Sequence, residues 1–97
     1  MKAQRVFYDK AVLADGAIVE MMIWQLPRAS AERPHGLKYR LYFGRDGKRI
    51  VGYDNERGKG DHKHLGEVEI RYRFVSLAQL VTDFLADVER ANGGHDE

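Results

Sequence analysis

The chain has 97 residues, with 43% hydrophobic and 32% charged content and no cysteine. This composition is typical of one small folded domain, and it excludes disulfides, thiolate nucleophiles and zinc sites built from cysteine. The net charge of +1 is too small for a strongly basic binder of duplex nucleic acid, and no run of about 18 apolar residues indicates a membrane span. We therefore expect a cytoplasmic protein without a membrane partner.

Two Asp-Gly dipeptides, at 15–16 and 46–47, lie between strand-like runs in the first half of the chain. This dipeptide favours the left-handed dihedral angles that a two-residue hairpin turn needs. We therefore predict two antiparallel hairpins. Their strands are residues 4–13 with 17–26 and residues 37–45 with 48–54.

The last third of the chain changes from a strand pattern to a helix pattern. Apolar and charged residues alternate over 67–74, which predicts a fifth strand with one face in water. From Ser76 onward the apolar residues follow the period of an amphipathic helix, and Ser76 with Gln79 fits a capping box. We expect this helix to cover the sheet and to end near Asn92.

These elements predict a fold of the α+β class. We expect an antiparallel sheet of about five strands, formed by two hairpins plus one strand, with one C-terminal amphipathic helix packed on one face. Because the helix covers one face only, the other face is a candidate homodimer interface. Residues 1–97 are expected to form a single domain. Its expected parts are a sheet over 4–74, a histidine-rich loop over 54–66, a helix over 76–92 and a disordered tail over 93–97.

Residues 53–64 gather carboxylates, imidazoles, cations and glycines between strand-like segments. A hydrophobic core does not select such a composition, so the segment is either a solvated turn or a functional site. The turn interpretation assigns Asp54 and Asn55 to an Asx turn and gives the glycines the positive φ angles of a long loop. The site interpretation takes two chemical forms.

In the first form, the segment cleaves RNA without a metal, which requires a base, an acid and cations that stabilise the charged phosphorane. His62 and His64 project to the same side of an extended chain, so they are candidates to exchange protons at one phosphate. Asp61 and Lys59 complete the candidate catalytic residues. Glycines let backbone amides approach a phosphate, and an exposed basic strand suits single-stranded RNA. The candidate substrate-binding residues are Arg57, Gly58, Gly60, Tyr53, Asp54, Lys38 and Arg40.

In the second form, Asp54, Asp61, His62 and His64 bind a divalent metal, because imidazole and carboxylate together suit Zn, Mn or Fe. Two lysines in the same segment oppose a cation there, and the His-x-His spacing is common in proteins without metal. The sequence therefore favours metal-independent chemistry with no cofactor.

The pattern Tyr53-Asp54-Asn55, Gly58-Lys59-Gly60-Asp61-His62 and His64 resembles the hallmark of the TumE family of toxin components. The similarity covers nearly the whole chain, and each position of the motif is matched. The resemblance implies a small bacterial toxin of a type II toxin-antitoxin pair, with a helix-turn-helix antitoxin as its partner. It implies a biological role without implying a reaction.

The residues and the resemblance together predict a toxin subunit that cleaves RNA with a His/Lys/Asp loop. One alternative is a non-catalytic binding module whose basic sheet face contacts an acidic protein or single-stranded nucleic acid. A further alternative is a metal-dependent hydrolase. His35, in a connection rich in Pro and Gly, is expected to be exposed to solvent.

Overall fold

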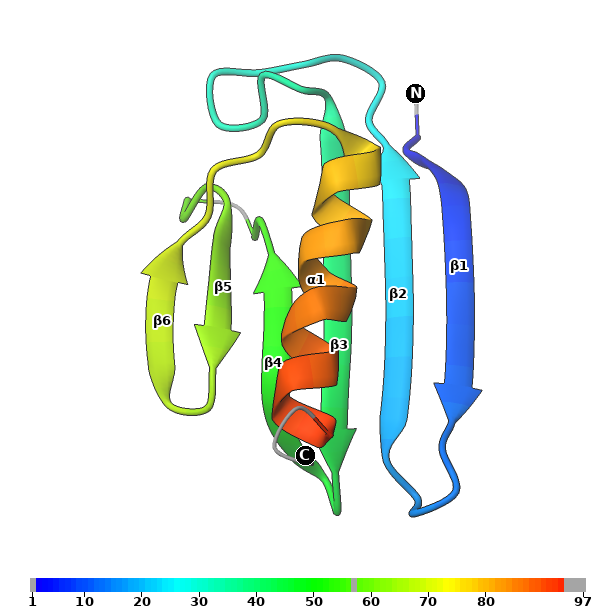
Figure 1. Ribbon diagram of the computed structural model, residues 1–97. Helices are drawn as coiled ribbons and strands as arrows, with labels where there is room; N and C mark the ends of the chain where they lie inside the picture. Colours follow the sequence, from blue (N-terminus) through cyan, green and yellow to red (C-terminus); the bar gives the residue numbers. More distant parts are fainter. Residues whose placement is uncertain (1, 57, 94–97) are drawn as a thin grey trace.

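The computed structural model describes residues 2–56 and 58–93. Within these residues, one antiparallel sheet contains six strands in the order of the chain, and a single helix runs along one face (Figure 1). That helix is not long and apolar enough to cross a membrane, and no other helix is formed by the described residues. The elements are β1 (Gln4–Val12), β2 (Ile18–Gln25), β3 (Leu37–Arg45), β4 (Lys48–Asp54), β5 (His62–Leu65), β6 (Val68–Arg71) and α1 (Leu77–Asn92).

The predicted α+β class and both Asp-Gly hairpins are confirmed. Gly16 and Gly47 have φ angles of 89° and 75°, and Asp46 adopts a φ of 55° in the second turn. In the second turn both residues of the dipeptide are left-handed, as predicted for a two-residue turn. In the first turn only Gly16 is left-handed, and the longer segment 13–17 joins the strands. The two turns join β1 to β2 and β3 to β4 as antiparallel pairs.

The strand count and the predicted loop 54–66 need correction. The described residues form six strands instead of about five, because β5 lies inside that loop, and β6 ends at Arg71 instead of continuing to residue 74. β5 pairs with β4 and β6, and Gly66 turns between β5 and β6 with a φ of 62°. Its sequence, His-Lys-His-Leu, lacks an apolar alternation. Pairing with residues elsewhere in the chain defines this strand, so a local pattern does not reveal it.

The core lies between the helix and the central strands. The helix contributes the buried side chains of Leu80, Phe84 and Val88, and it packs against β4, where the Tyr53 ring meets Phe84 edge-on at 5.6 Å. Removing this apolar surface from water is the main force that holds the helix on the sheet. No described element covers the opposite sheet face. The buried sheet residues include Val19, Met21, Ile23, Tyr39, Leu41, Phe43, Val51 and Tyr53.

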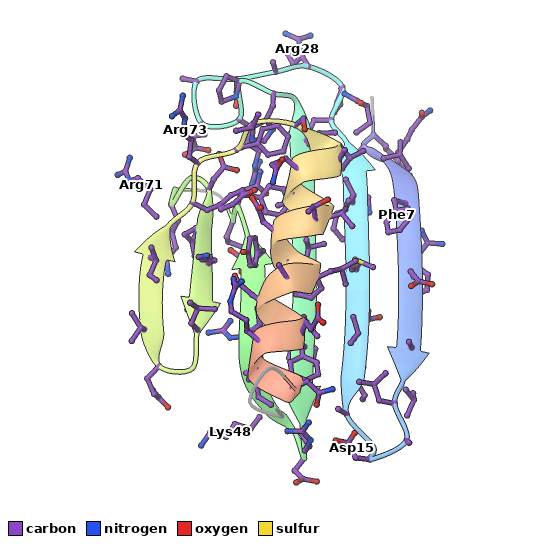
Figure 2. All side chains as sticks on the ribbon, viewed as in Figure 1. Phe7, Asp15, Arg28, Lys48, Arg71 and Arg73 are labelled. Carbon is purple, nitrogen blue, oxygen red and sulfur yellow. The ribbon has the colours of Figure 1, made fainter. Side chains whose placement is uncertain are left out.

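Positive side chains border the strand that carries the two central histidines. Figure 2 shows Arg71 and Arg73 pointing away from the body of the protein beside β6. Both residues are exposed, and Arg71 pairs directly with His62 in the sheet register. The sheet edge next to β5 therefore presents cations to solvent.

The N-terminus of α1 depends on Ser76, whose Oγ accepts a hydrogen bond from the backbone N–H of Gln79 at 3.1 Å. We expect Ser76→Ala to lower the free energy of unfolding by about 1 kcal/mol, because one amide at the helix start loses its acceptor. Urea unfolding monitored by circular dichroism measures this change. Ser76→Asp keeps an acceptor and serves as the control. Equal losses in both variants would contradict a capping role.

Candidate functional site

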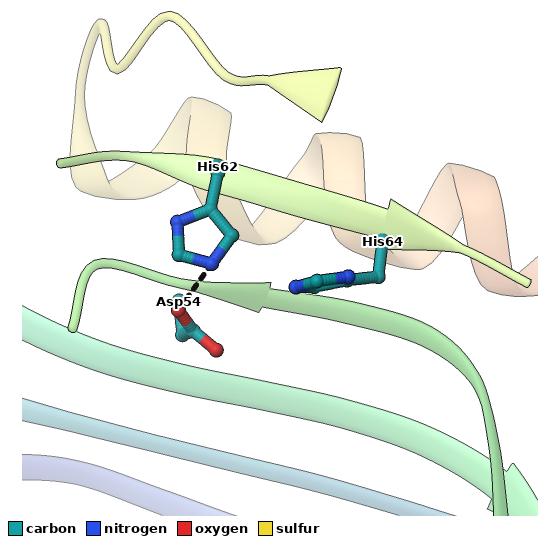
Figure 3. Close-up of side chains that lie close together, drawn as sticks. All are labelled: Asp54, His62 and His64. Atoms are coloured by element: carbon teal, nitrogen blue, oxygen red, sulfur yellow. Dashed lines mark ion pairs between the residues drawn. The ribbon is translucent and has the colours of Figure 1, made fainter. Parts of the chain in front are cut away.

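Strand pleating places three candidate residues on the sheet face opposite α1, which we call the open face. Asp54 ends β4 and pairs directly with His62 in β5, while His64 lies two residues further along β5 and faces the same side. We call Asp54, His62 and His64 the histidine cluster (Figure 3). One ligand atom from each side chain lies within 4.8 Å of the others. The sheet register therefore assembles a carboxylate and two imidazoles at one point.

His62 is held firmly within the cluster. Its side chain is only 6% exposed, and its Nε2 lies 2.8 Å from Oδ1 of Asp54. Its Nδ1 lies 3.0 Å from the carbonyl oxygen of Gly60. Both ring nitrogens are therefore engaged by protein atoms, which leaves neither one free for a substrate in this conformation.

His64 has a different environment. Burial lowers the pKa of its imidazole, and the positive charge of Arg49 lowers that pKa further, against an opposing contribution from Glu69. Its ring meets the His62 ring edge-on, with 5.1 Å between centroids. These influences favour the neutral form of the His64 imidazole. Within the described residues its ring makes no hydrogen bond, so its nitrogens are free to meet a ligand.

A depression of about 390 Å³ opens beside the histidine cluster. Arg40 pairs directly with Asp54 in the sheet register, and Arg49 lies against Gly52, where a Cβ atom would overlap the arginine side chain. Guanidinium groups bind phosphate oxygens well because they carry a fixed charge and paired donors. The depression therefore suits an anionic ligand. Its lining includes Arg40, Tyr42, Lys48, Arg49, Gly52 and Asp54.

Arg49 is a site residue that sequence reasoning missed. Strict alternation along β4 would place Arg49 on the same face as the buried Val51. The register shifts between Phe43 and Gly44, so that Gly44 pairs with Arg49 while Phe43 pairs with Val51. This bulge moves Arg49 to the open face. A bulge leaves no clear mark in a single sequence, and the Gly44 beside it was the only available signal.

Asp61 lies next to the cluster in sequence, but its carboxylate belongs to another set of contacts. The Tyr39 hydroxyl donates to its Oδ1 at 2.6 Å, and Nε2 of His35 lies 3.1 Å from the same oxygen. The backbone N–H of Leu37 donates to Nδ1 of His35, so Nε2 of that ring carries the proton and donates to Asp61. The structure therefore does not bring the Asp61 carboxylate into the histidine cluster.

His35 and Tyr53 also lie elsewhere than sequence reasoning suggested. His35 is only partly exposed, because its ring packs against Phe74 with 4.0 Å between centroids. The expectation of a solvent-exposed His35 is therefore wrong. Tyr53 lies under α1 on the buried face, and its hydroxyl donates to Asp87 at 2.5 Å. Both side chains hold the fold together around the site.

The remaining loop candidates surround the cluster at a greater distance. Lys59 forms an ion pair with Glu69 at 3.6 Å, and it lines a second depression together with His62 and Arg71. Gly58 and Gly60 have positive φ angles of 86° and 73°. The amide of Gly58 donates to a side chain of the protein itself, at Glu32. Arg57 lies outside the described residues, as do residues 94–97 of the predicted tail.

The predicted basic strand face is present beside the cluster. Lys38 and Arg40 are exposed on β3, and the Lys38 ammonium lies 5.3 Å from the centre of the Trp24 ring. Tyr42 follows on the same side of β3. A track of cations and aromatic rings thus leads across the open face to the histidine cluster.

These features define a small α+β domain whose uncovered sheet face combines cations, aromatic rings and a histidine–carboxylate cluster, a combination that suits ligands with phosphate groups. A family model described as Toxin TumE matches residues 2–92. The chain therefore belongs to the TumE family of toxins, and its family implies an antitoxin partner. Comparisons with curated proteins and with solved structures found no match.

Proposed function

We propose that this toxin cleaves RNA on the open face, with the reacting phosphate at the histidine cluster. The observation that carries this proposal is the position of the cluster beside a depression lined by Arg40 and Arg49. The histidine cluster, which would act on the phosphate, thus lies next to the two arginines that would bind it. The partner that restrains the toxin would be a helix-turn-helix antitoxin encoded beside it.

The reaction has defined requirements. The 2'-hydroxyl oxygen bonds to phosphorus and loses its proton, the bond from phosphorus to the 5'-oxygen breaks, and the 5'-oxygen gains a proton. Negative charge grows on the non-bridging oxygens during this exchange. Arg40 and Arg49, which line the depression beside the cluster, would stabilise that charge.

The assignment of proton-transfer roles differs from the sequence-based scheme. That scheme makes His62 and His64 an acid and a base, which requires a free ring nitrogen on each. His62 offers none in this conformation, because Asp54 and Gly60 engage both of its nitrogens. We therefore assign the chemistry to Asp54, His62 and His64 together and give no separate acid and base roles to the two histidines.

The substrate would be a single strand that crosses β3. Lys38 and Arg40 would contact the phosphates, while Trp24 and Tyr42 offer aromatic surfaces on which bases stack. Bases that are not paired are free to stack on such rings, so we propose unpaired RNA as the substrate.

Growth after induction tests the toxin role and the site together. We expect the wild-type chain to arrest bacterial growth and His64→Gln to allow growth at equal soluble protein, because His64 has the only free imidazole of the cluster. Glu89→Gln, on the exposed side of α1, is the control, since α1 covers the other sheet face. Coexpression of the adjacent helix-turn-helix protein should restore growth.

RNA cleavage by purified protein tests the reaction itself. Labelled single-stranded RNA should be cut by the wild-type chain and remain intact with His64→Gln. RNA that stays intact in excess wild-type protein across neutral pH, with and without divalent metals, would overturn the proposal. Binding of RNA without turnover under those conditions would favour the non-catalytic binding module instead.

A further inference from the structure

The two ring nitrogens of His62 face two atoms that only accept hydrogen bonds. The carbonyl oxygen of Gly60 requires a proton on Nδ1. In the neutral ring, Nε2 then presents its lone pair to the Asp54 carboxylate at 2.8 Å. Two electron-rich atoms at this distance need a proton or a metal ion between them.

We propose that the histidine cluster binds one divalent first-row transition metal. The ligands are Nε2 of His62, a carboxylate oxygen of Asp54 and a ring nitrogen of His64. The part that this metal takes in RNA cleavage rests on the proposed function, whereas the binding itself does not.

The spacing of the ligand atoms fits one ion. Ligands at about 2.0–2.2 Å from a metal lie about 3–3.5 Å from one another in tetrahedral or octahedral geometry. The Asp54 and His62 atoms are already at 2.8 Å, and all three ligand atoms lie within 4.8 Å of one another. Rotation of the His64 side chain would be needed to close the remaining gap, and no hydrogen bond within the described residues opposes it.

The orientation of His62 is the one that a metal ligand needs. Histidines that bind metals usually donate the other ring N–H to a carbonyl or carboxylate, which fixes the ring and directs the free lone pair at the ion. The contact from Nδ1 to the Gly60 carbonyl has this form. Because the ring is also buried, binding would cost little further loss of side-chain freedom.

The ligand types indicate the class of metal. Two imidazoles and one carboxylate suit Zn²⁺, Mn²⁺ or Fe²⁺, whereas Mg²⁺ and Ca²⁺ prefer oxygen ligands throughout. Three protein ligands on one side of the ion leave positions open for a ligand from outside. A phosphate oxygen is the group that the neighbouring depression would supply.

The charged side chains around the histidine cluster both repel and attract a metal ion. Arg49 lies near His64, and Arg40 lies opposite Asp54, and both repel a cation. Glu69 attracts one, since its Oε2 lies 3.6 Å from Nε2 of His62. A phosphate bound to the two arginines would cancel their repulsion. We therefore expect metal and phosphate to strengthen each other's binding.

A metal in this position changes the roles of the two histidines. His62 and His64 would hold the ion and exchange no proton, and the ion would withdraw charge from a phosphoryl oxygen, as Arg40 and Arg49 would. The proton of the 2'-hydroxyl then passes to solvent, and the 5'-oxygen takes its proton from solvent.

Titration of the metal-stripped full chain tests the inference. Isothermal calorimetry with Zn²⁺ and with Mn²⁺ should give one site per chain in the wild type. We expect His64→Gln to weaken binding by more than the roughly 10–100-fold that removal of a ligand's hydrogen-bond partner costs. His64 is the preferred variant because its side chain is less buried than that of His62. Co²⁺ should add visible absorption bands that the variant lacks.

His35→Gln is the matched control, because it also removes a histidine that contacts a carboxylate but lies outside the cluster. It should keep wild-type affinity, with circular dichroism and a melting curve confirming that each variant is folded. Should His35→Gln unfold, Glu89→Gln, on the exposed side of α1, takes its place. The inference is overturned if wild type and His64→Gln bind with equal affinity, or if the wild type does not bind at all.

Inorganic phosphate supplies a second arm, since adding it should tighten metal binding by the wild type and not by Arg49→Gln. Equal enhancement in both would overturn the coupling between metal and phosphate. Metal binding without RNA cleavage would support this inference and overturn the proposed function. RNA cleavage by a wild-type chain that binds no metal would overturn this inference and support the proposed function.

Discussion

Asp87→Ala is expected to lower the free energy of unfolding by about 3–5 kcal/mol, as removal of one partner from a buried ion pair usually does. Its carboxylate is 3% exposed and accepts hydrogen bonds from Tyr53 at 2.5 Å and from Lys63 at 3.1 Å, and Arg90 donates to it as well. Without it, the Lys63 ammonium would face the core with no compensating charge. Urea unfolding provides the measurement.

Glu89→Ala is the control for Asp87→Ala, because Glu89 is an exposed acid on the same helix and should change stability by about 0.5 kcal/mol or less. A double variant, Asp87→Ala with Lys63→Met, should recover part of the loss, since it also removes the unpaired charge. A loss below about 1 kcal/mol for Asp87→Ala alone would contradict a central role for this contact.

The same contact predicts how stability depends on pH. Burial raises the pKa of Asp87, but hydrogen bonds from Tyr53, Lys63 and Arg90 outweigh it and bring the pKa below its usual value. A depressed pKa in the folded state adds stability above the unfolded-state pKa of about 4, and this stability is lost as the pH falls through the folded-state pKa. The stability difference between wild type and Asp87→Asn should therefore shrink in acid. A difference that grows in acid would contradict the assignment.

Asp61→Ala is expected to lower the free energy of unfolding by about 3 kcal/mol, because it removes a charged acceptor from two partly buried donors. Tyr39 donates to Asp61 at 2.6 Å, and His35 is held between Asp61 and Phe74. Burial and the hydrogen bond to Asp61 raise the pKa of Tyr39, so its hydroxyl remains a donor. Thermal and urea unfolding measure the loss.

A double-mutant cycle with Tyr39→Phe separates structure from chemistry for Asp61. The two changes share one hydrogen bond, so their effects on stability should add to more than the effect of the double variant. If Asp61→Ala kept wild-type stability and lost RNA cleavage, Asp61 would be a member of the reacting site, as the sequence first suggested.

The parts of the fold that the sequence predicts are those with local causes. Asp46 and Gly47 make a turn through their own dihedral angles, and the stripe that contains Leu80 and Phe84 marks a helix through its spacing. β5 has no such cause. Four residues with two histidines and a lysine form a strand because β4 and β6 supply backbone partners on both sides.

For the candidate site, too, only the features with local causes could be predicted from the sequence. The i, i+2 spacing was enough to place His62 and His64 on one side of an extended chain, but the contact between His62 and Asp54 depends on the sheet register. Arg49 reaches the site through a bulge, and Asp61 leaves it through contacts with residues before β3 and within it. Such pairings join distant parts of the chain, so composition alone does not reveal them.

The alternation of faces along β5 ties the site to the core. Lys63 lies between the two histidines in sequence, yet it points to the opposite side and pairs with Asp87 under the helix. A slip of one residue would exchange the faces, bringing the lysine into the open and hiding both imidazoles. The site therefore forms in only one register of β5. The contact between Lys63 and Asp87 on α1 favours that register.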